Sequence, residues 1–282
     1  MQDLLHRIFS QKVLESRSMG GGDISQAYLV RTQDQQIFLK LNHADQALAM
    51  YETEASGLAR LGSVDGVSTP EVVRVGVIDG TAFIAMQFVQ SSHPSAKYWR
   101  DLAENLASIH KTTGAKFGLD HHNFIGSLIQ SNHQVDDWAA FFDLHRLRPQ
   151  IQMAIENNLL DKSHMLSLED LVKRLPEICP DEPPALVHGD LWAGNKICGP
   201  NQKAFFIDPA IAFAHREMDL AMAKLFGGFD PLFFDHYQQL YPLVAGFASR
   251  CNVYQLYYLL VHLNLFGQSY YPQVNSILKQ YD

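Results

Sequence analysis

The residues best suited to chemistry gather in one short stretch, Leu186–Asn195, with the sequence LVHGDLWAGN. Its apolar start gives way to a glycine and the carboxylate of Asp190, and the amide Asn195 follows five positions later. On a loop, such a carboxylate can accept a hydroxyl proton while the amide holds a metal ion on nucleotide phosphates. Asp208 ends a second apolar run thirteen residues after Asn195 and supplies a second carboxylate for the metal. The pattern therefore indicates phosphoryl transfer.

Each of these pieces also has a purely structural interpretation. His-Gly-Asp is common in turns, and an Asp-Pro pair such as Asp208–Pro209 often begins a turn. Either piece alone would more often be structural than catalytic. Their order and spacing in one chain favour the catalytic hypothesis.

A glycine-rich segment near the N-terminus is a candidate for binding the phosphates. It contains Gly20, Gly21, Gly22 and Ser25 and precedes a strand predicted at 27–30. Backbone amides that carry no side-chain bulk can approach phosphate oxygens closely. The segment matches neither the G-x-G-x-x-G pattern nor a Walker A loop, so a flexible hairpin is an equal alternative.

A lysine inside an apolar strand supports the phosphate-binding hypothesis. In Ile37–Leu41, alternation places Phe38 and Lys40 on one face of the predicted strand and the aliphatic residues on the other. A buried ammonium group needs a partner, and Glu54 falls within the apolar arc of the helix predicted over 45–61. We therefore predict a Lys40–Glu54 ion pair, which in kinases orients the nucleotide phosphates. In the alternative, Lys40 reaches solvent at a sheet edge and Glu54 is solvated.

The remaining pattern changes from strands to helices. Strands are predicted at 71–76 and 81–89, and the connector Gln87, Phe88 and Val89 offers backbone groups to a purine ring. The Ser- and Pro-rich Ser91–Ser95 is the predicted boundary between an N-terminal nucleotide-binding lobe, 1–90, and a C-terminal catalytic and substrate-binding lobe, 91–282. Helices are predicted over 1–15, 98–110, 137–158, 167–178, 215–229, 231–241 and within 251–280, with a long loop over 111–136.

Length and composition exclude several classes of protein. The 282 residues allow one large domain or two smaller ones, and 47% hydrophobic with 18% charged residues is typical of a soluble globular protein. The net charge of -8 argues against nucleic acid and anionic membranes as partners. No stretch approaches the roughly 20 apolar residues of a membrane span, so we expect a cytoplasmic protein.

The cysteines and histidines give no sign of a metal site. Cys179, Cys198 and Cys251 lie far apart, which argues against disulfides and zinc binding. The adjacent His121 and His122 are expected to have structural or solvent-facing roles, because neighbouring residues rarely converge on one ion.

Taken together, the residues resemble the fructosamine/ketosamine-3-kinases, a family that shares the protein-kinase-like fold with aminoglycoside phosphotransferases and choline kinases. The resemblance covers nearly the whole chain. Besides the glycine-rich segment, Lys40 and Glu54, it includes HRLRPQ at 145–150, HGDLWAGN at 188–195, DPA at 208–210, DLA at 219–221, FGGF at 226–229 and HLN at 262–264.

The resemblance implies roles for individual residues. Asp190 is the general base for a sugar hydroxyl, and Asn195 and Asp208 are magnesium ligands. Lys40 contacts the nucleotide phosphates and Glu54 orients it. Trp192 lines the sugar pocket, where an aromatic face can pack on the C–H side of a sugar. Asn123, Phe141, His262 and Asn264 are further candidates for the acceptor pocket, with a structural role as the alternative for each.

The resemblance also implies a fold and an activity. The fold is α+β and two-lobed, protein-kinase-like, with an antiparallel-sheet N-lobe that has one main helix and a mainly helical C-lobe. The activity is MgATP-dependent phosphorylation of the 3-hydroxyl of ketosamines, ribulosamine or fructosamine adducts of amines or protein lysines, which implies deglycation repair. Two alternatives stay open: a phosphotransferase for an aminoglycoside, choline or a sugar metabolite, and a nucleotide-binding module without catalysis. The sequence leaves the preferred ketosamine and the oligomeric state open.

Overall fold

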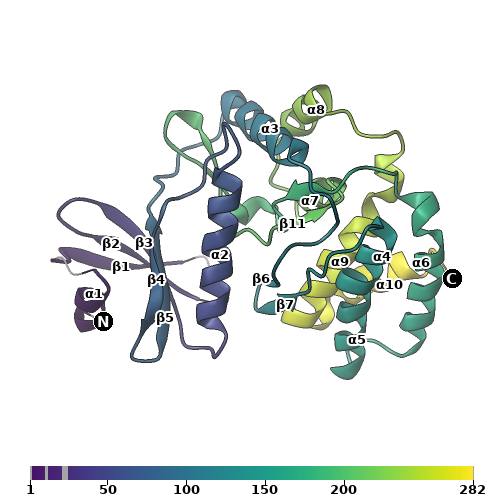
Figure 1. Cartoon of the computed structure of the whole chain (residues 1–282), viewed down its shortest axis with the longest axis horizontal. Helices are drawn as coiled ribbons and strands as arrows, with labels where there is room; N and C mark the ends of the chain where they lie inside the picture. Colours follow the sequence, from purple (N-terminus) through teal and green to yellow (C-terminus); the bar gives the residue numbers. More distant parts are fainter. Residues whose placement is uncertain (1, 10–11, 21–24, 282) are drawn as a thin grey trace.

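The structure is a computed structural model, and it describes residues 2–9, 12–20 and 25–281. Figure 1 shows a lobe built on a β-sheet beside a larger, mainly helical lobe. The α+β, two-lobed architecture that the sequence predicts is therefore confirmed. No helix among the described residues is long and apolar enough to span a membrane.

Strands of the N-terminal lobe form one antiparallel sheet in the order β1-β2-β3-β5-β4. They are β1 (Glu15–Met19), β2 (Gln26–Arg31), β3 (Gln36–Asn42), β4 (Val72–Ile78) and β5 (Thr81–Gln87). Two helices accompany the sheet, α1 (Gln2–Ile8) and α2 (Ala47–Gly62). Because β3 lies between β2 and β5, both of its edges are paired in the sheet.

The alternation predicted for β3 decides what each face contacts. Ile37, Leu39 and Leu41 are buried in a cluster with Leu5 and Ile8 of α1. The opposite face looks toward α2, whose Tyr51 and Leu58 pack against Ile84 and Met86 of β5. Lys40 lies on this second face, between the sheet and the helix.

The helix predicted over 1–15 is wrong in its extent. The structure has α1 ending at Ile8, and Glu15 already begins β1. This edge strand is almost entirely exposed, so it lacks the alternation of apolar and polar residues from which a strand is recognised. It pairs with β2 through backbone hydrogen bonds, which the side-chain pattern does not predict.

The C-terminal lobe is mainly helical. Its helices are α3 (Ala96–Lys111), α4 (Trp138–Phe142), the π-helix η1 (Asp143–Leu147), α5 (Arg148–Glu156), α6 (Ser163–Ile178), α7 (Glu217–Leu225), α8 (Pro231–Leu240), α9 (Phe247–Phe266) and α10 (Tyr271–Leu278). Short strands pair as β6 (Asn123–Ile125) with β7 (Leu128–Gln130), β8 (Ala185–Val187) with β11 (Ala212–Ala214), and β9 (Lys196–Cys198) with β10 (Ala204–Phe206).

Several predicted boundaries in this lobe are corrected by the structure. The loop predicted over 111–136 contains the β6–β7 hairpin, which is held by buried polar residues and not by an alternating apolar pattern. The helix predicted over 215–229 is only α7, because Gly227 and Gly228 adopt positive φ angles of 72° and 79°. The boundary predicted between 90 and 91 stays a prediction; β5 ends at Gln87 and α3 begins at Ala96.

Candidate active site between the two lobes

Lys40 connects the two lobes through its ammonium group. Its Nζ donates a hydrogen bond to Oε1 of Glu54 at 2.9 Å and also contacts the carboxylate of Asp208. The side chains of Lys40 and Glu54 are each 13% exposed. The predicted Lys40–Glu54 ion pair is confirmed, and the sheet-edge alternative is wrong because β3 is an inner strand.

The three charges shift one another's pKa values. Burial alone would lower the pKa of Lys40, but the carboxylates of Asp208 and Glu54 raise it well above its ordinary value. Burial would raise the pKa of Asp208, and the Lys40 ammonium reverses this and lowers it. Burial, partly offset by the Lys40 ammonium, raises the pKa of Glu54 above its ordinary value. Of the two carboxylates, Asp208 is therefore the one that stays ionised more readily.

Asp190 and Asn195 face each other across the loop that follows β8. The Asn195 side-chain nitrogen donates to the Asp190 carbonyl at 2.9 Å and to its Oδ2 at 3.0 Å. Burial, and then the negative charge of Asp208, raises the pKa of Asp190 to about 7. A carboxyl group that titrates near neutral pH is well matched to proton transfer from an alcohol.

The backbone brings the Asp190 loop and the Asp208 segment into close contact. Gly189 has a φ of 84°, and a Cβ atom there would lie 2.0 Å from the carbonyl oxygen of Ala210. The amide of Ala210 donates to the carbonyl of His188 at 2.9 Å. Asp208 itself has a φ of 52°, which is uncommon for a residue with a side chain. Only glycine fits at position 189, so this glycine is required by the site.

A buried carboxylate on α7 fixes the backbone ahead of Asp190. The amides of His188 and Gly189 donate to the two oxygens of Asp219 at 2.7 and 2.9 Å. Asp219 is fully buried, and the ring of His110 lies 3.1 Å from its Oδ2. Asp219 is a residue for which no role was predicted from the sequence. The available signal was an acid inside an apolar helical run, since a buried charge needs hydrogen-bond donors.

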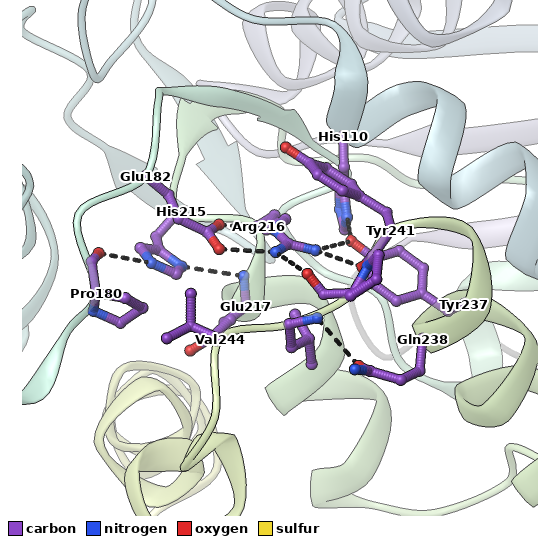
Figure 2. Close-up of polar contacts among 12 residues, drawn as sticks. His110, Pro180, Glu182, His215, Arg216, Glu217, Tyr237, Gln238, Tyr241 and Val244 are labelled. Carbon is purple, nitrogen blue, oxygen red and sulfur yellow. Dashed lines mark hydrogen bonds and ion pairs between the residues drawn. The ribbon is translucent and has the colours of Figure 1, made fainter.

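Figure 2 shows how this anchor continues away from the site. Nδ1 of His110 lies 2.7 Å from the hydroxyl of Tyr237, and Nη1 of Arg216 donates to the same hydroxyl at 3.3 Å. Arg216 also donates to both carboxylate oxygens of Glu182 at 2.7 Å each. Arg216, Tyr237, His110 and Asp219 form a relay in which each residue donates to the next when Tyr237 donates to His110 and His110 donates to Asp219.

An apolar pocket lies between the lobes beside these charges. Its lining consists of Met19, Phe38, Pro70, Met86, Gln87, Phe88, Val89, Ser91, Ile197, Ile207 and Asp208. The three predicted connector residues all line it. The amides of Gln87 and Phe88 already donate to the carbonyls of Glu71 and Gln36, so other backbone groups are left to meet a ligand. The shape and apolar lining suit a flat heteroaromatic ring.

The glycine-rich segment is only partly described. Gly21 and Gly22 lie outside the described residues. At Gly20 no atom of the described residues lies within 4 Å of a hypothetical Cβ. Ser25 accepts a hydrogen bond from the hydroxyl of Tyr51 at 2.9 Å. Tyr51 belongs to α2, so Ser25 lies on the same side of the sheet as Glu54.

Trp192 is exposed on the loop that follows β8, with 41% of its surface accessible. Its ring covers Gly194, where a Cβ atom would lie 2.3 Å from the ring. The ring of half-buried His262 lies against that of the exposed Phe226, with a centroid distance of 4.7 Å and an angle of 49° between the ring planes. The other acceptor candidates are engaged inside the protein: Asn123 and Phe141 are buried, and Asn264 donates to Gln150.

The cysteines and histidines form no metal centre in the described part of the chain. Cys179, Cys198 and Cys251 are buried free thiols. No cluster of three His, Cys, Asp or Glu side chains suited to a metal occurs among the described residues. His121 pairs with Asp120, and His122 accepts a hydrogen bond from the amide of Asn132.

Comparison with known proteins places this site in a family. The family model described as fructosamine kinase matches residues 2–281. A protein of Enterococcus faecium assigned as a ketoamine kinase is 38% identical over 263 residues, which cover 93% of each chain. A solved structure from Haemophilus somnus 129PT, assigned as a fructosamine-3-kinase, has a TM-score of 0.89 at 28% identity and covers 99% of this chain and 96% of its own.

A more distant likeness concerns the fold alone. The structure of aminoglycoside phosphotransferase APH(4)-Ia has a TM-score of 0.67 at 17% identity and covers 100% of this chain and 98% of its own. The family model matches nearly the full length, and the ketoamine kinase relative spans both lobes. This chain is a member of the fructosamine kinase family.

Proposed function

We propose that this chain transfers the γ-phosphoryl group of MgATP to the 3-hydroxyl of a ketosamine, with Asp190 as the general base. As a fructosamine kinase, it is an ATP-dependent phosphotransferase that acts on ketosamines. The observation that carries the catalytic assignment is the pairing of Asp190 with Asn195 opposite Asp208, whose carboxylate also contacts Lys40. Proton acceptor, metal ligands and phosphate-binding cation are thereby gathered at one place.

The side chains of Asn195 and Asp208 fit a magnesium ion. Asn195 uses its nitrogen on Asp190, which leaves its oxygen as a ligand. Lys40 keeps the pKa of Asp208 low, so this carboxylate is ionised. Mg²⁺ prefers such oxygen donors and commonly takes one or two of them from the protein and the rest from phosphates and water. When bound, the ion would offset the negative charge on the phosphates.

Each protein group would have a defined task in the transfer. Asp190 accepts the proton of the attacking 3-hydroxyl, for which a pKa of about 7 is favourable. Lys40 donates to the nucleotide phosphates, and Glu54 holds the ammonium in the required direction. The adenine ring enters the apolar pocket at Gln87–Val89. Gly20, Gly21, Gly22 and Ser25 would cover the phosphates from the side of the sheet.

The acceptor sugar would lie between Asp190 and the ring of Trp192, which belong to the same loop. An exposed aromatic ring beside the general base can pack against the C–H face of a sugar, which orients its hydroxyl groups. The adduct is small in the simplest case, and glycated protein lysines are a further proposed substrate. Phosphorylation of such adducts implies repair of glycated molecules, and we expect a cytoplasmic location for it.

The acceptor class is tested by a panel of substrates. ATP consumption and phosphorylated product are measured with ribulose-lysine, fructose-lysine, an aminoglycoside and choline. The proposal expects turnover with a ketosamine and little with the others. Turnover only with an aminoglycoside or choline would move the chain to another phosphotransferase activity. ATP binding without any transfer would instead favour the non-catalytic module.

A further inference from the structure

Two buried amide side chains hold the backbone that follows Asp208. Nε2 of Gln130 donates to the carbonyl of Ala210 at 3.1 Å, and Nδ2 of Asn123 donates to the carbonyl of Ile211 at 2.8 Å. Both amides come from the β6–β7 hairpin, about 80 residues away in sequence. The carbonyls of the segment are therefore tied to a different part of the lobe.

The hairpin amides are themselves fixed by further hydrogen bonds. Nε2 of Gln130 and Nδ2 of Asn132 donate to Oδ1 of Asn123 at 2.8 and 2.9 Å. The hydroxyl of Tyr257, on α9, donates to Oε1 of Gln130 at 2.7 Å. All these groups are buried, so each lost partner would leave a polar atom without water to replace it.

A buried arginine completes the network. The guanidinium of Arg146 donates to Oδ1 of Asn132 at 2.8 Å and to the carbonyls of Ser131 and His145 at 2.5 and 2.8 Å. Only 3% of Arg146 is exposed, and no carboxylate among the described residues pairs with it. Its charge lies over the rings of Phe141 and Tyr257 instead.

Arg146 enters the network from an unusual element. It belongs to the π-helix Asp143–Leu147, which lies between α4 and α5. Single π-helical turns are rare and frequently occur at functional sites. A cation buried without a counter-charge is costly, so packing alone explains this arrangement poorly. The π-helical turn and the unpaired cation both indicate a task for Arg146 beyond the core.

The segment that the network holds is strained. Asp208 has a φ of 52°, a left-handed conformation that persists in a non-glycine residue only when its surroundings enforce it. Pro209 has a fixed φ and sterically restricts the backbone of Asp208 before it, and the amide of Ala210 donates to the carbonyl of His188. The donors from Asn123 and Gln130 fix the two carbonyls that follow. Together these contacts leave the Asp208 backbone little freedom to relax.

We propose that Tyr257, Gln130, Asn123 and Arg146 are positioning residues that hold the segment 208–211 and thereby keep the Asp208 carboxylate in place for the metal of the nucleotide. The inference rests on the proposed function, because it takes Asp208 as a metal ligand. It gives Asn123 a role different from the predicted contact with the acceptor, and it gives a role to Arg146 of the HRLRPQ segment. No sequence pattern predicted a role for Tyr257, and it is the member that is tested most simply, because a single hydroxyl can be removed from it.

The test measures the dissociation constant of ATP by calorimetry with and without Mg²⁺. The Mg²⁺-dependent gain is the ratio of the metal-free constant to the constant with Mg²⁺, and it reports on the metal site without any acceptor. Tyr257→Phe removes one hydroxyl and leaves Oε1 of Gln130 without its donor. We expect the Mg²⁺-dependent gain to fall about fivefold or more, the range expected for an unsatisfied buried acceptor. The affinity for metal-free ATP should stay at the wild-type value.

The next residue of α9 provides a matched control. Tyr258 is also buried, but its hydroxyl has no hydrogen-bond partner in the part of the chain that the structure describes. Tyr258→Phe should therefore keep the wild-type ratio, while Asp208→Asn should abolish the gain. A Tyr257→Phe protein with the wild-type ratio overturns the proposal, and so does an equal loss in Tyr258→Phe.

A second substitution extends the test to the hairpin. Asn123→Leu removes the donor to Ile211 at similar side-chain size and should lower the same ratio. If this variant does not fold, the result for Tyr257→Phe decides alone. A wild-type protein that shows the Mg²⁺ gain but phosphorylates no ketosamine refutes the proposed function and leaves this inference standing. A wild-type gain that survives Asp208→Asn refutes the inference.

Discussion

The side-chain nitrogen of Asn195 lies 3.0 Å from the carboxylate oxygen Oδ2 of Asp190. This contact joins the proposed general base to a proposed metal ligand. A substitution at either residue should therefore disturb the side chain of the other.

Asp190→Asn keeps the size of the side chain and removes the base. We expect kcat to fall on the order of 10² to 10⁴-fold, the usual contribution of a positioned general base. The dissociation constant of ATP should change little, since Asp190 is not predicted to contact the nucleotide. Steady-state kinetics with ribulose-lysine, together with calorimetric ATP binding, check both parts. Full activity in this variant would show that Asp190 is not the base.

Glu54→Gln tests the orientation of Lys40. The substitution removes one of the two carboxylates that hold the ammonium and leaves Asp208 as the other. We expect kcat/KM for ATP to fall on the order of 10²-fold, as for other groups that stabilise developing charge. Glu52→Gln, on the exposed side of the same helix, is the control and should leave kcat/KM unchanged. Equal effects of the two substitutions would contradict the assigned role.

Gly189→Ala tests the close approach of the loop that carries Asp190 to the segment that follows Asp208. The new Cβ atom would collide with the carbonyl of Ala210, and the positive φ adds its own strain. Gly80→Ala is a matched control, because its φ of 75° is similar and its Cβ would meet no atom of the described residues within 4 Å. We expect Gly80→Ala to lose about 1 to 2 kcal/mol of stability and Gly189→Ala to lose clearly more. Thermal unfolding compares the two, and only Gly189→Ala should also abolish turnover.

His215 should make stability depend on pH. Burial is the main reason that its pKa lies at about 4, below the ordinary 6.5. In Figure 2 its Nε2 faces the carbonyl of Pro180 and its Nδ1 the amide of Glu217, a neutral ring with both nitrogens satisfied. As the pH falls, the unfolded chain binds a proton first, so this stabilisation is complete above pH 6.5 and is lost between 6.5 and 4.

The contribution of His215 can be isolated with His215→Gln, which keeps a donor and an acceptor but does not titrate. The wild type should lose about 3 kcal/mol more than the variant over this interval, the equivalent of roughly 2.5 pKa units. Urea unfolding at pH 7, 5.5 and 4.5 measures the difference. Parallel pH profiles for the two proteins would exclude His215 as the responsible group.

Trp192→Ala tests the acceptor side of the site. Loss of the exposed ring should raise the KM for the ketosamine about three- to tenfold, as expected for one aromatic contact, and leave the KM for ATP unchanged. Leu166→Ala serves as the control, because Leu166 is 63% exposed on α6. An increase in the KM for ATP but not for the ketosamine would place Trp192 on the nucleotide side instead.

The sequence by itself determined the parts of the site that depend on local periodicity. The alternation around Lys40 and the helical position of Glu54 predicted that both side chains point into one interface, and the structure confirms their contact. The spacing of Asp190 and Asn195 predicted a shared loop, and their side chains do meet. These predictions succeed because, in a regular strand or helix, the position of a residue in a short stretch of sequence fixes the direction in which its side chain points.

The tertiary structure alone decided which distant residues hold that loop in place. Asp219 binds the amides of His188 and Gly189 from about 30 positions away, and Asn123 reaches the carbonyl of Ile211 across 88 positions. No periodicity relates such pairs. A buried carboxylate or amide must find donors or acceptors, but which ones it finds depends on how the lobes pack, and that packing is absent from any short stretch of sequence.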